Sequence, residues 1–352
     1  MKIVTVVGAR PQLVKAAPMS RAIRRKHTEV LVHTGQHYDY SMSQVFFQEL
    51  DIPKPAINLG VGSGSHGRQT GQMLVRLESV LLSEKPDWLV VYGDTNSTLA
   101  GALAAAKLGI KVAHVEAGLR SFNRSMPEEV NRVLTDHVSD LLFCPSQTAA
   151  ANLASEGIVR GVRVVGDVMA DALAHFSKQA RMTSNVLARL GLVHGDYFVA
   201  TVHRAENADS PMRLSAIMQA LDALGRTVVF PAHPRTRKFL SAFGYAPSRN
   251  VLLIEPLGYL DMIRLEEGAC AILTDSGGVQ KEAYWLGVPC VTLREETEWV
   301  ETVQVGWNVL AGVDPERIVQ AVKSFVPPKT RPVLYGDGGA ADRCVLALEE
   351  TL

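Results

Sequence analysis

Residues 269–282 read Ala-Cys-Ala-Ile-Leu-Thr-Asp-Ser-Gly-Gly-Val-Gln-Lys-Glu. The apolar run 269–273 predicts a buried strand, and a helical pattern follows the two glycines. A strand that passes through a glycine-rich turn into a helix is the repeating unit of parallel α/β folds. The segment therefore indicates an α/β fold.

The same alternation of strand and helix patterns extends along the whole chain. Continuous apolar runs are typical of strands that are buried on both faces of a parallel sheet. The predicted strands are 3–7, 29–33, 88–92, 111–115, 140–143 and 163–165, followed by a second series at 197–201, 227–230, 251–254, 269–273 and 289–293. We predict two Rossmann-like, doubly wound domains with a cleft between them, 1–167 and 168–339, and a final helix, 340–352, that joins the first domain.

Composition excludes several classes of protein. The 352 residues are 47% apolar and 20% charged, which describes a soluble globular chain with more than one core. Lys+Arg and Asp+Glu both total 36, so no net charge would attract nucleic acid or a membrane. No apolar run approaches the roughly 20 residues that span a bilayer, and the N-terminal strand is too short for a signal peptide. We expect a cytoplasmic protein with no nucleic-acid or membrane partner.

The sequence indicates no metal and no cofactor. Cys144, Cys270, Cys290 and Cys344 lack CxxC spacing, so we expect buried thiols rather than disulfides or metal ligands. No HExxH or comparable spacing of histidines and carboxylates is present. The loop after the first strand lacks the Gly-x-Gly-x-x-Gly spacing, which argues against NAD.

Polar side chains follow the predicted strands directly, where ligands bind in doubly wound folds. These loops are 8–11, 93–96, 114–118, 203–207, 233–235 and 275–278. At 275–278, Ser276 and two glycines begin a helix, so backbone N–H groups could approach a phosphate, and Glu282 could accept hydrogen bonds from a ribose. The set predicts a nucleotide-diphosphate site, and the alternative for 275–282 is a turn that binds nothing.

Three of the candidates near the N-terminus have a structural interpretation beside the functional one. Arg10 and Lys15 suit the charge of a phosphate leaving group, or they lie solvated in a loop and a first helical turn. Asp94 is a candidate acid or base, or the N-cap of the helix that follows.

The remaining candidates leave similar alternatives open. Glu116 is a carboxylate at the end of an apolar strand, which is unusual without a function. Glu128 follows Pro127 in the first turn of a helix, where it could simply complement the helix dipole. His203, beside Arg204, is a candidate for phosphate contact or acid catalysis, against the alternative of a core histidine.

Together these segments resemble the non-hydrolysing UDP-N-acetylglucosamine 2-epimerases, whose fold is that of the GT-B glycosyltransferases. The resemblance runs nearly end to end. It rests on Gly8-Ala9-Arg10-Pro11-Gln12 with Lys15, Gly35-Gln36-His37, Gly93-Asp94-Thr95, His114-Val115-Glu116-Ala117-Gly118-Leu119-Arg120, Pro127-Glu128-Glu129 with Asn131-Arg132, His203-Arg204, Asp275-Ser276-Gly277-Gly278 with Gln280 and Glu282, Pro289, Thr297-Glu298 and Tyr335-Gly336-Asp337-Gly338. In this order and spacing the motifs are specific.

The resemblance implies interconversion of UDP-GlcNAc and UDP-ManNAc, through elimination of UDP to a 2-acetamidoglucal and re-addition. It also implies a homodimer and no cofactor. The implied catalytic residues are Lys15, Asp94, Glu116, Glu128 and His203. The implied ligands of UDP and the sugar are Arg10, Arg132, Arg204, Ser276, Gly277, Gly278 and Glu282, with His203 also a candidate phosphate ligand.

The chain departs from the family pattern at several positions. Asp39 and Gln72 stand where members activated by their own substrate carry a glutamine and an arginine, which argues against that regulation. Ala9, Gln12 and Trp299-Val300 resemble the epimerases of UDP-2,3-diacetamido-2,3-dideoxyglucuronate, which is the alternative function. More remote alternatives are a GT-B glycosyltransferase, which would need an acceptor groove, and an inactive nucleotide-sugar sensor.

Overall fold

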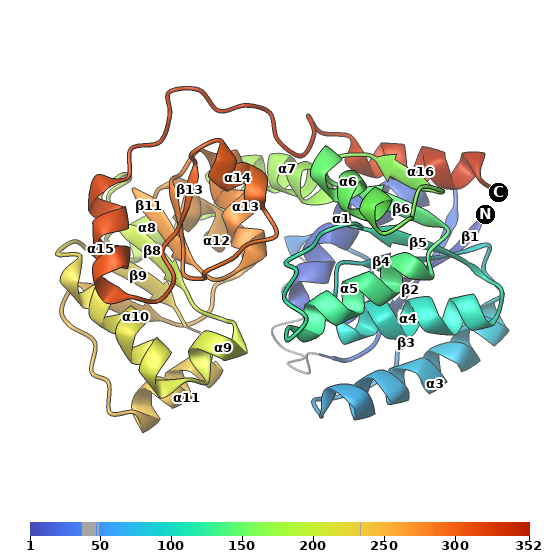
Figure 1. Ribbon diagram of the computed structural model, residues 1–352, viewed down its shortest axis with the longest axis horizontal. Helices are drawn as coiled ribbons and strands as arrows, with labels where there is room; N and C mark the ends of the chain where they lie inside the picture. Colours follow the sequence, from blue (N-terminus) through green and yellow to red (C-terminus); the bar gives the residue numbers. More distant parts are fainter. Residues whose placement is uncertain (37–46, 48, 233) are drawn as a thin grey trace. The chain divides into compact units, whose positions relative to one another are not determined.

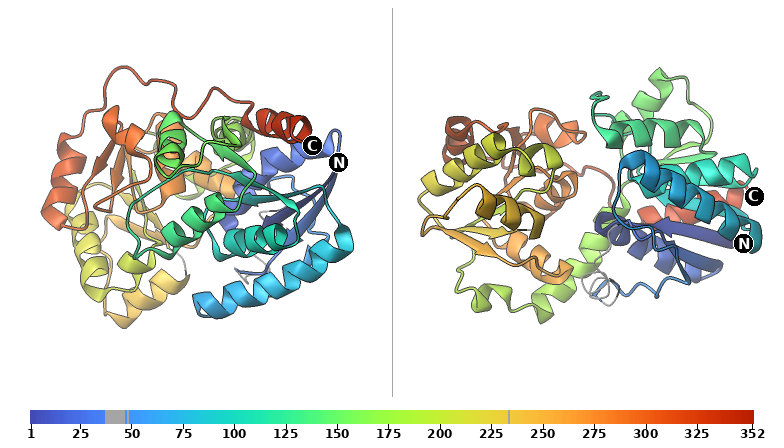
Figure 2. Two further views of the ribbon diagram at one scale, coloured as in Figure 1. Left: turned by 45° about the vertical axis from the view of Figure 1, so that its right-hand side comes forward. Right: turned by 90° about the horizontal axis from the view of Figure 1, so that it is seen from below.

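The computed structural model describes residues 1–36, 47, 49–232 and 234–352. The chain divides into two compact units, residues 1–174 with 335–352, and residues 175–334. Each unit contains one parallel sheet with helices on both of its faces (Figures 1 and 2). The boundaries predicted from the sequence, 167/168 and 339/340, lie a few residues from these divisions.

The first unit has a seven-stranded parallel sheet in the order β3-β2-β1-β4-β5-β6-β7. Its strands are β1 (Lys2–Val7), β2 (Thr28–His33), β3 (Ile57–Asn58), β4 (Trp88–Tyr92), β5 (Lys111–Val115), β6 (Leu141–Cys144) and β7 (Val162–Val164). Its helices are α1 (Arg10–Arg24), α3 (His66–Glu84), α4 (Asn96–Lys107), α5 (Pro127–His137), α6 (Gln147–Ser155), the first part of α7 (Val168–Thr183) and α16 (Ala340–Glu350). Met73 and Leu77 of α3 and Ala100 of α4 pack against Val4 and Val6 of β1, which explains the continuous apolar strands.

The second unit has a six-stranded parallel sheet in the order β10-β9-β8-β11-β12-β13. Its strands are β8 (Phe198–Thr201), β9 (Val228–Pro231), β10 (Val251–Ile254), β11 (Ala271–Thr274), β12 (Cys290–Thr292) and β13 (Asn308–Leu310). Its helices are α8 (Val186–Arg189), α9 (Ala205–Ala208), α10 (Pro211–Ala223), α11 (Pro234–Ala242), α12 (Tyr259–Glu267), α13 (Gly277–Leu286), α14 (Val300–Gln304) and α15 (Pro315–Ser324). Leu214 and Ile318 belong to the core of one face, and Leu265 and Ala283 to that of the other.

The prediction of two parallel, doubly wound sheets is confirmed. Every run predicted as a strand overlaps an observed strand, and the ends differ by at most two residues. Strands β3 and β13 were not predicted; β3 has only two residues, too few for a periodic signal. The cleft predicted between the domains stays a prediction.

The four cysteines differ in their exposure to solvent. Cys144, Cys290 and Cys344 are buried, Cys270 is partly exposed, and all four are free thiols. Burial raises the pKa of the Cys144 and Cys290 thiols to about 12. Across the described ranges there is no cluster of three or more potential metal ligands, and no helix with the length and apolar content of a membrane span.

Each sheet has one point where the strand order reverses, between β1 and β4 in the first unit and between β8 and β11 in the second. Loops on either side of such a point diverge, which is why doubly wound folds bind ligands there. The loops that follow these four strands hold residues 8–9, 93–95, 202–204 and 275–276. The main sequence motifs therefore border the two reversal points.

Candidate active site

Gln12 holds the loop after β1 against the end of β4. Its side chain is buried, and its Oε1 accepts hydrogen bonds from the N–H groups of Gly8 (2.8 Å) and Ala9 (3.0 Å). Its Nε2 donates to the carbonyl oxygen of Tyr92 (2.9 Å). Glycine is required at position 8, because a Cβ there would lie 2.1 Å from Ser97 Oγ. The start of α1 is thus fixed beside the reversal point.

Lys15 of α1 and Glu116 at the end of β5 form a buried ion pair. Glu116 has φ +72°, a left-handed backbone conformation that is uncommon for a residue other than glycine. Gly93 borders the pair, since a Cβ on it would lie 3.0 Å from Lys15 Nζ and 3.1 Å from Glu116 Oε2. A buried carboxylate in a strained backbone conformation is characteristic of functional sites. Arg10, also predicted for the site, begins α1 and is half-buried.

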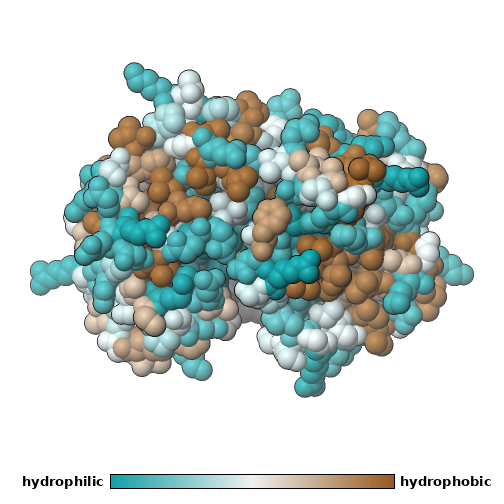
Figure 3. Space-filling model, viewed as in Figure 1, coloured by the Kyte–Doolittle hydropathy of each residue, from teal (hydrophilic) through white to brown (hydrophobic). Residues whose placement is uncertain are grey.

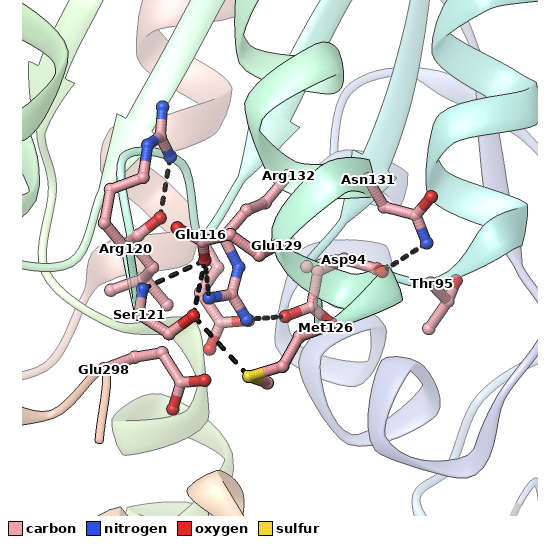
Figure 4. Close-up of polar contacts among 12 residues, drawn as sticks. Asp94, Thr95, Glu116, Arg120, Ser121, Met126, Glu129, Asn131, Arg132 and Glu298 are labelled. Carbon is pink, nitrogen blue, oxygen red and sulfur yellow. Dashed lines mark hydrogen bonds and ion pairs between the residues drawn. The ribbon is translucent and has the colours of Figure 1, made fainter. Parts of the chain in front are cut away.

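A second ion pair joins Asp94 to Arg132 of α5 (Figure 4). Arg132 is buried, and its other terminal nitrogen donates to Glu129 Oε2 at 2.7 Å. Glu129 also accepts hydrogen bonds from the backbone N–H groups of Ser121 and Phe122, each at 2.9 Å. Glu129 therefore fixes both Arg132 and the loop that follows β5.

Asp94 does not cap the helix that follows it. Thr95 is the N-cap of α4, and its side chain accepts a hydrogen bond from the N–H of Thr98. The carbonyl oxygen of Asp94 accepts a hydrogen bond from Asn131 at 2.9 Å. Glu128 lies half-buried at the second position of α5, in the acidic first turn of that helix. The capping alternative for Asp94 is wrong, and the dipole alternative for Glu128 stays open.

His114 of β5 joins the two loops that carry Asp94 and Glu116. It is fully buried, with Nε2 2.7 Å from the carbonyl oxygen of Gly93 and Nδ1 2.7 Å from Asp136 Oδ1. The other oxygen of Asp136 accepts hydrogen bonds from the N–H of Gly118 (3.2 Å) and from Arg120 (2.7 Å). Burial favours a raised pKa for Asp136, but His114 and Arg120 outweigh it, so this pKa is lowered.

In the second unit, the carboxylate of Asp275 fixes the loop after β8. It accepts hydrogen bonds from the backbone N–H groups of His203 (2.9 Å) and Arg204 (3.1 Å), and from the side chain of Asn207 (3.0 Å). Asp275 is fully buried, whereas His203 is exposed. The core-histidine alternative for His203 is therefore wrong.

The N-terminus of α13 adjoins the same loop. Ser276 is its N-cap residue, yet its hydroxyl accepts no capping hydrogen bond from the first N–H groups of the helix. Helix N-termini of this kind bind phosphate through these groups and the helix dipole. Gly277 and Gly278 form the first turn, and a Cβ at Gly277 would lie 2.9 Å from Trp299 Nε1. Glu282 is buried in the second turn, where it accepts a hydrogen bond from Tyr259 at 3.0 Å.

The loop before α14 is held by charged side chains. Arg294 donates to both carboxylate oxygens of Glu298, at 3.0 and 3.2 Å. Arg204 lies 3.8 Å from the same carboxylate. Trp299 is buried beside Lys281, whose ammonium lies 3.8 Å from the centre of one of its rings. The departure from the family motif at 299 therefore lies next to the start of α13.

The structure thus brings the predicted residues together in two groups. The first unit pairs Lys15 with Glu116 and Asp94 with Arg132. The second unit places His203 and Arg204 on the loop beside Ser276, Gly277 and Gly278, with Glu282 one turn further along α13. His37, Asp39 and His233, which belong to predicted motifs or loops, lie outside the described residues.

Sequence reasoning assigned no function to several residues that organise these groups. Glu129, His114 and Asp275 belong to quoted motifs, but a buried hydrogen-bonding role has no signature in the residue type. Asp136 and Tyr259 lie outside the quoted motifs. The one available signal was the occurrence of polar residues within otherwise apolar strand and helix faces.

The fold is that of the GT-B proteins. A model of the UDP-N-acetylglucosamine 2-epimerase family matches residues 21–349. A UDP-N-acetylglucosamine 2-epimerase homolog from Methanococcus maripaludis is 54% identical, and the match covers 99% of each chain. The UDP-2,3-diacetamido-2,3-dideoxy-D-glucuronate 2-epimerase of Pseudomonas aeruginosa is 49% identical, covering 97% of this chain and 98% of that one.

The crystal structure of Methanocaldococcus jannaschii UDP-GlcNAc 2-epimerase in complex with UDP-GlcNAc and UDP superimposes with a TM-score of 0.94. Its sequence is 46% identical, and the match covers 99% of this chain and 100% of that one. The chain belongs to the UDP-N-acetylglucosamine 2-epimerase family. The enzymes of this family are isomerases.

Proposed function

We propose that the protein interconverts UDP-GlcNAc and UDP-ManNAc by inverting C2 of the sugar, without net hydrolysis. One observation carries the proposal: Asp94 and Glu116 each face a cation, Arg132 and Lys15, where the strand order of the first sheet reverses. Two carboxylates suit a reaction that removes a proton from one face of a carbon and returns one to the other.

The reaction needs more than a base, because C2 of an N-acetylhexosamine is not adjacent to a carbonyl. Departure of UDP gives C1 oxocarbenium character, which acidifies the C2 proton and allows a 2-acetamidoglucal to form. Re-addition of UDP with protonation on the opposite face gives the epimer. In this scheme Lys15, Asp94, Glu116 and Glu128 surround the reacting sugar, and Arg132 orients Asp94.

We assign UDP to residues of the second unit and to Arg10. The first N–H groups of α13, from Gly277 and Gly278, would bind the diphosphate together with Ser276. His203 and Arg204, fixed by Asp275, would offset the charge of departing UDP, and Glu282 would accept hydrogen bonds from the ribose. The M. jannaschii relative binds UDP-GlcNAc and UDP, which supports this assignment.

We also propose a homodimer. The apolar side chains that are exposed in the first unit include Val130 and Leu134 of α5, four residues apart on one helical face, and Val75 and Leu82 of α3. Figure 3 shows apolar side chains among polar ones over this part of the first unit. Burying them in a contact between two copies would remove this apolar surface from water.

The second candidate substrate is UDP-2,3-diacetamido-2,3-dideoxyglucuronate. It is supported by the 49% identity to the P. aeruginosa enzyme, whose name specifies that substrate. Trp299, one of the departures by which the sequence resembles that group, borders Gly277 at the start of α13. A tryptophan there would alter the space around the pyrophosphate and the sugar next to it.

A steady-state comparison of the two substrates tests the assignment. Product UDP-sugars are separated by ion-exchange chromatography, and free UDP and free sugar are quantified to detect hydrolysis. We expect UDP-GlcNAc to be converted to a second UDP-sugar with no accumulation of free UDP. A kcat/KM that favours the uronate by more than about a hundredfold, or ~2.7 kcal/mol, would replace UDP-GlcNAc with the second candidate.

A further inference from the structure

We propose that His114 is a positioning residue for the epimerisation: its Nε2–H group fixes the peptide that carries Asp94. The inference rests on the proposed function of Asp94 as an acid or base. His114 itself is fully buried in β5 and contacts no reacting atom, so its effect must pass through the backbone of Gly93.

Both backbone polar groups of Gly93, the residue before Asp94, form hydrogen bonds. The N–H of Gly93 donates to the carbonyl oxygen of Val115 at 3.0 Å, and its own carbonyl oxygen lies 2.7 Å from His114 Nε2. A carbonyl oxygen can only accept, so Nε2 carries the proton. Gly93 has φ +60° and its carbonyl shares a plane with the N–H of Asp94. The direction of this carbonyl therefore fixes the peptide plane that holds the backbone N and Cα of Asp94.

The other side of the imidazole is held equally firmly. Nδ1 faces Asp136 Oδ1, while Oδ2 of the same carboxylate accepts from Arg120 and from the N–H of Gly118. The ring is thus fixed in orientation by a buried carboxylate that is itself fixed by two donors.

The same network reaches the backbone next to the second carboxylate. Asp136 binds the N–H of Gly118, two residues after Glu116, and the N–H groups of Glu116 and Ala117 both donate to the carbonyl oxygen of Phe143 at 3.1 Å. His114 therefore connects the loop of Asp94 to the loop of Glu116. A displacement of about 1 Å between catalytic groups can cost about a hundredfold in rate.

Two substitutions separate the two contacts of the imidazole. In His114→Gln the amide nitrogen can reach the place of Nε2, so the hydrogen bond to Gly93 can be kept and the contact with Asp136 is lost. In His114→Asn the amide nitrogen replaces Nδ1, so the contact with Asp136 can be kept and the one with Gly93 is lost. Both variants remove a buried aromatic ring, so a purely structural role predicts similar losses of activity.

The measurement is kcat and KM for UDP-GlcNAc, with the melting temperature and the UDP Kd of each variant. We expect His114→Asn to lower kcat by about a hundredfold, and His114→Gln by less than about tenfold, with KM and UDP affinity near those of the wild type. Equal losses in kcat, or the lower kcat in His114→Gln, would overturn the proposal.

Asp136→Asn keeps the inference testable if either His114 variant fails to fold. It leaves His114 and its contact with Gly93 in place but exchanges one acceptor of Arg120 and Gly118 for an amide, so we expect kcat to fall by clearly less than the hundredfold expected when the Gly93 contact is lost. A loss of about a hundredfold with unchanged UDP affinity would contradict the role of the Gly93 contact. Wild-type enzyme that exchanges no C2 proton would instead refute the proposed function, so the two failures are distinguishable.

Discussion

Arg132 of α5 forms an ion pair with Asp94 at the end of β4, and both terminal nitrogens of the guanidinium are engaged. Glu129 accepts from the second nitrogen and is itself bound to the backbone of Ser121 and Phe122. A guanidinium is a rigid, planar fork, so holding one side of it orients the other. Glu129 therefore orients the Asp94 carboxylate through Arg132, although Glu129 and Asp94 form no hydrogen bond with each other.

The first prediction concerns the candidate carboxylates. Asp94→Asn, Glu116→Gln and Glu128→Gln each remove one proton-transferring group, so we expect kcat to fall by about two to four orders of magnitude. UDP affinity, measured by calorimetry, should change little because these groups act on the sugar. The matched control is Glu78→Gln, an exposed carboxylate of α3, which should keep wild-type kcat. Near-normal kcat in all three variants would remove them from the mechanism.

The second prediction concerns the buried carboxylate of Asp275. It does not depend on which sugar the enzyme binds. Asp275→Asn replaces a charged acceptor with an amide, whose NH₂ group cannot accept from the N–H of His203 or Arg204. Losing a charge-assisted hydrogen bond should weaken UDP binding by about 1–3 kcal/mol.

The control for that variant is Asp314→Asn. Asp314 is exposed and caps α15 through the N–H of Arg317, a role that asparagine performs equally well. UDP affinity should be unchanged in Asp314→Asn. An unchanged UDP Kd in Asp275→Asn would show that the loop 203–204 does not bind the diphosphate.

The third prediction is a pH dependence of stability in the first unit. The hydrogen bond from Arg120 lowers the pKa of Glu156, and Arg120 with His114 lowers that of Asp136 against the effect of burial. A carboxylate whose pKa is lower in the folded than in the unfolded state stabilises the fold at pH values above its unfolded-state pKa. This contribution is lost as the pH falls through the folded-state pKa. The stabilisation should therefore be complete at neutral pH and disappear below about pH 4.

Arg120→Met removes the shared partner, so its melting temperature should lie well below that of the wild type at neutral pH. The difference should shrink as the pH falls below about 4.5. Arg163→Met, at an exposed arginine of β7, is the control and should show a small, pH-independent difference. A constant difference for Arg120→Met would contradict the assignment of the lowered pKa values.

The fold could be predicted because its signal is carried by many residues at once. An apolar run as short as 88–92 favours a buried strand over a helix, and all five residues of β4 are buried. The order of the strands in each sheet follows from the general behaviour of doubly wound folds. Short strands such as β3 carry too few residues for this kind of reasoning.

The chemistry of the site could be predicted only in part. Lys15 and Glu116 are 101 positions apart in the sequence, and no pattern in the sequence shows that they pair. Some hydrogen bonds that position the candidate residues involve the backbone, such as that between His114 and the carbonyl oxygen of Gly93. Every residue possesses a backbone carbonyl, so the sequence does not indicate these bonds. Residue types and the order of the motifs therefore supplied the candidate side chains, whose roles stay predictions, and the structure was needed to find what orients them.

The fourth prediction concerns regulation. Gln72 is exposed on α3. The resemblance predicts that this position corresponds to an arginine in the members of the family that their own substrate activates. We expect velocity against UDP-GlcNAc to be hyperbolic, because amide and carboxylate groups cannot replace a cation that binds an activator. The reverse reaction should start from pure UDP-ManNAc without delay. A lag that a trace of UDP-GlcNAc abolishes would show that a regulatory site is present.

The central claim is that the C2–H bond breaks and reforms while UDP returns to the same sugar. Incubation of the wild-type enzyme with UDP-GlcNAc in deuterated water tests it most directly, with proton NMR and mass spectrometry of the recovered UDP-sugars. We predict deuterium at C2 in both epimers and no accumulation of free UDP. Full retention of the C2 proton, in starting material and product, would contradict the claim.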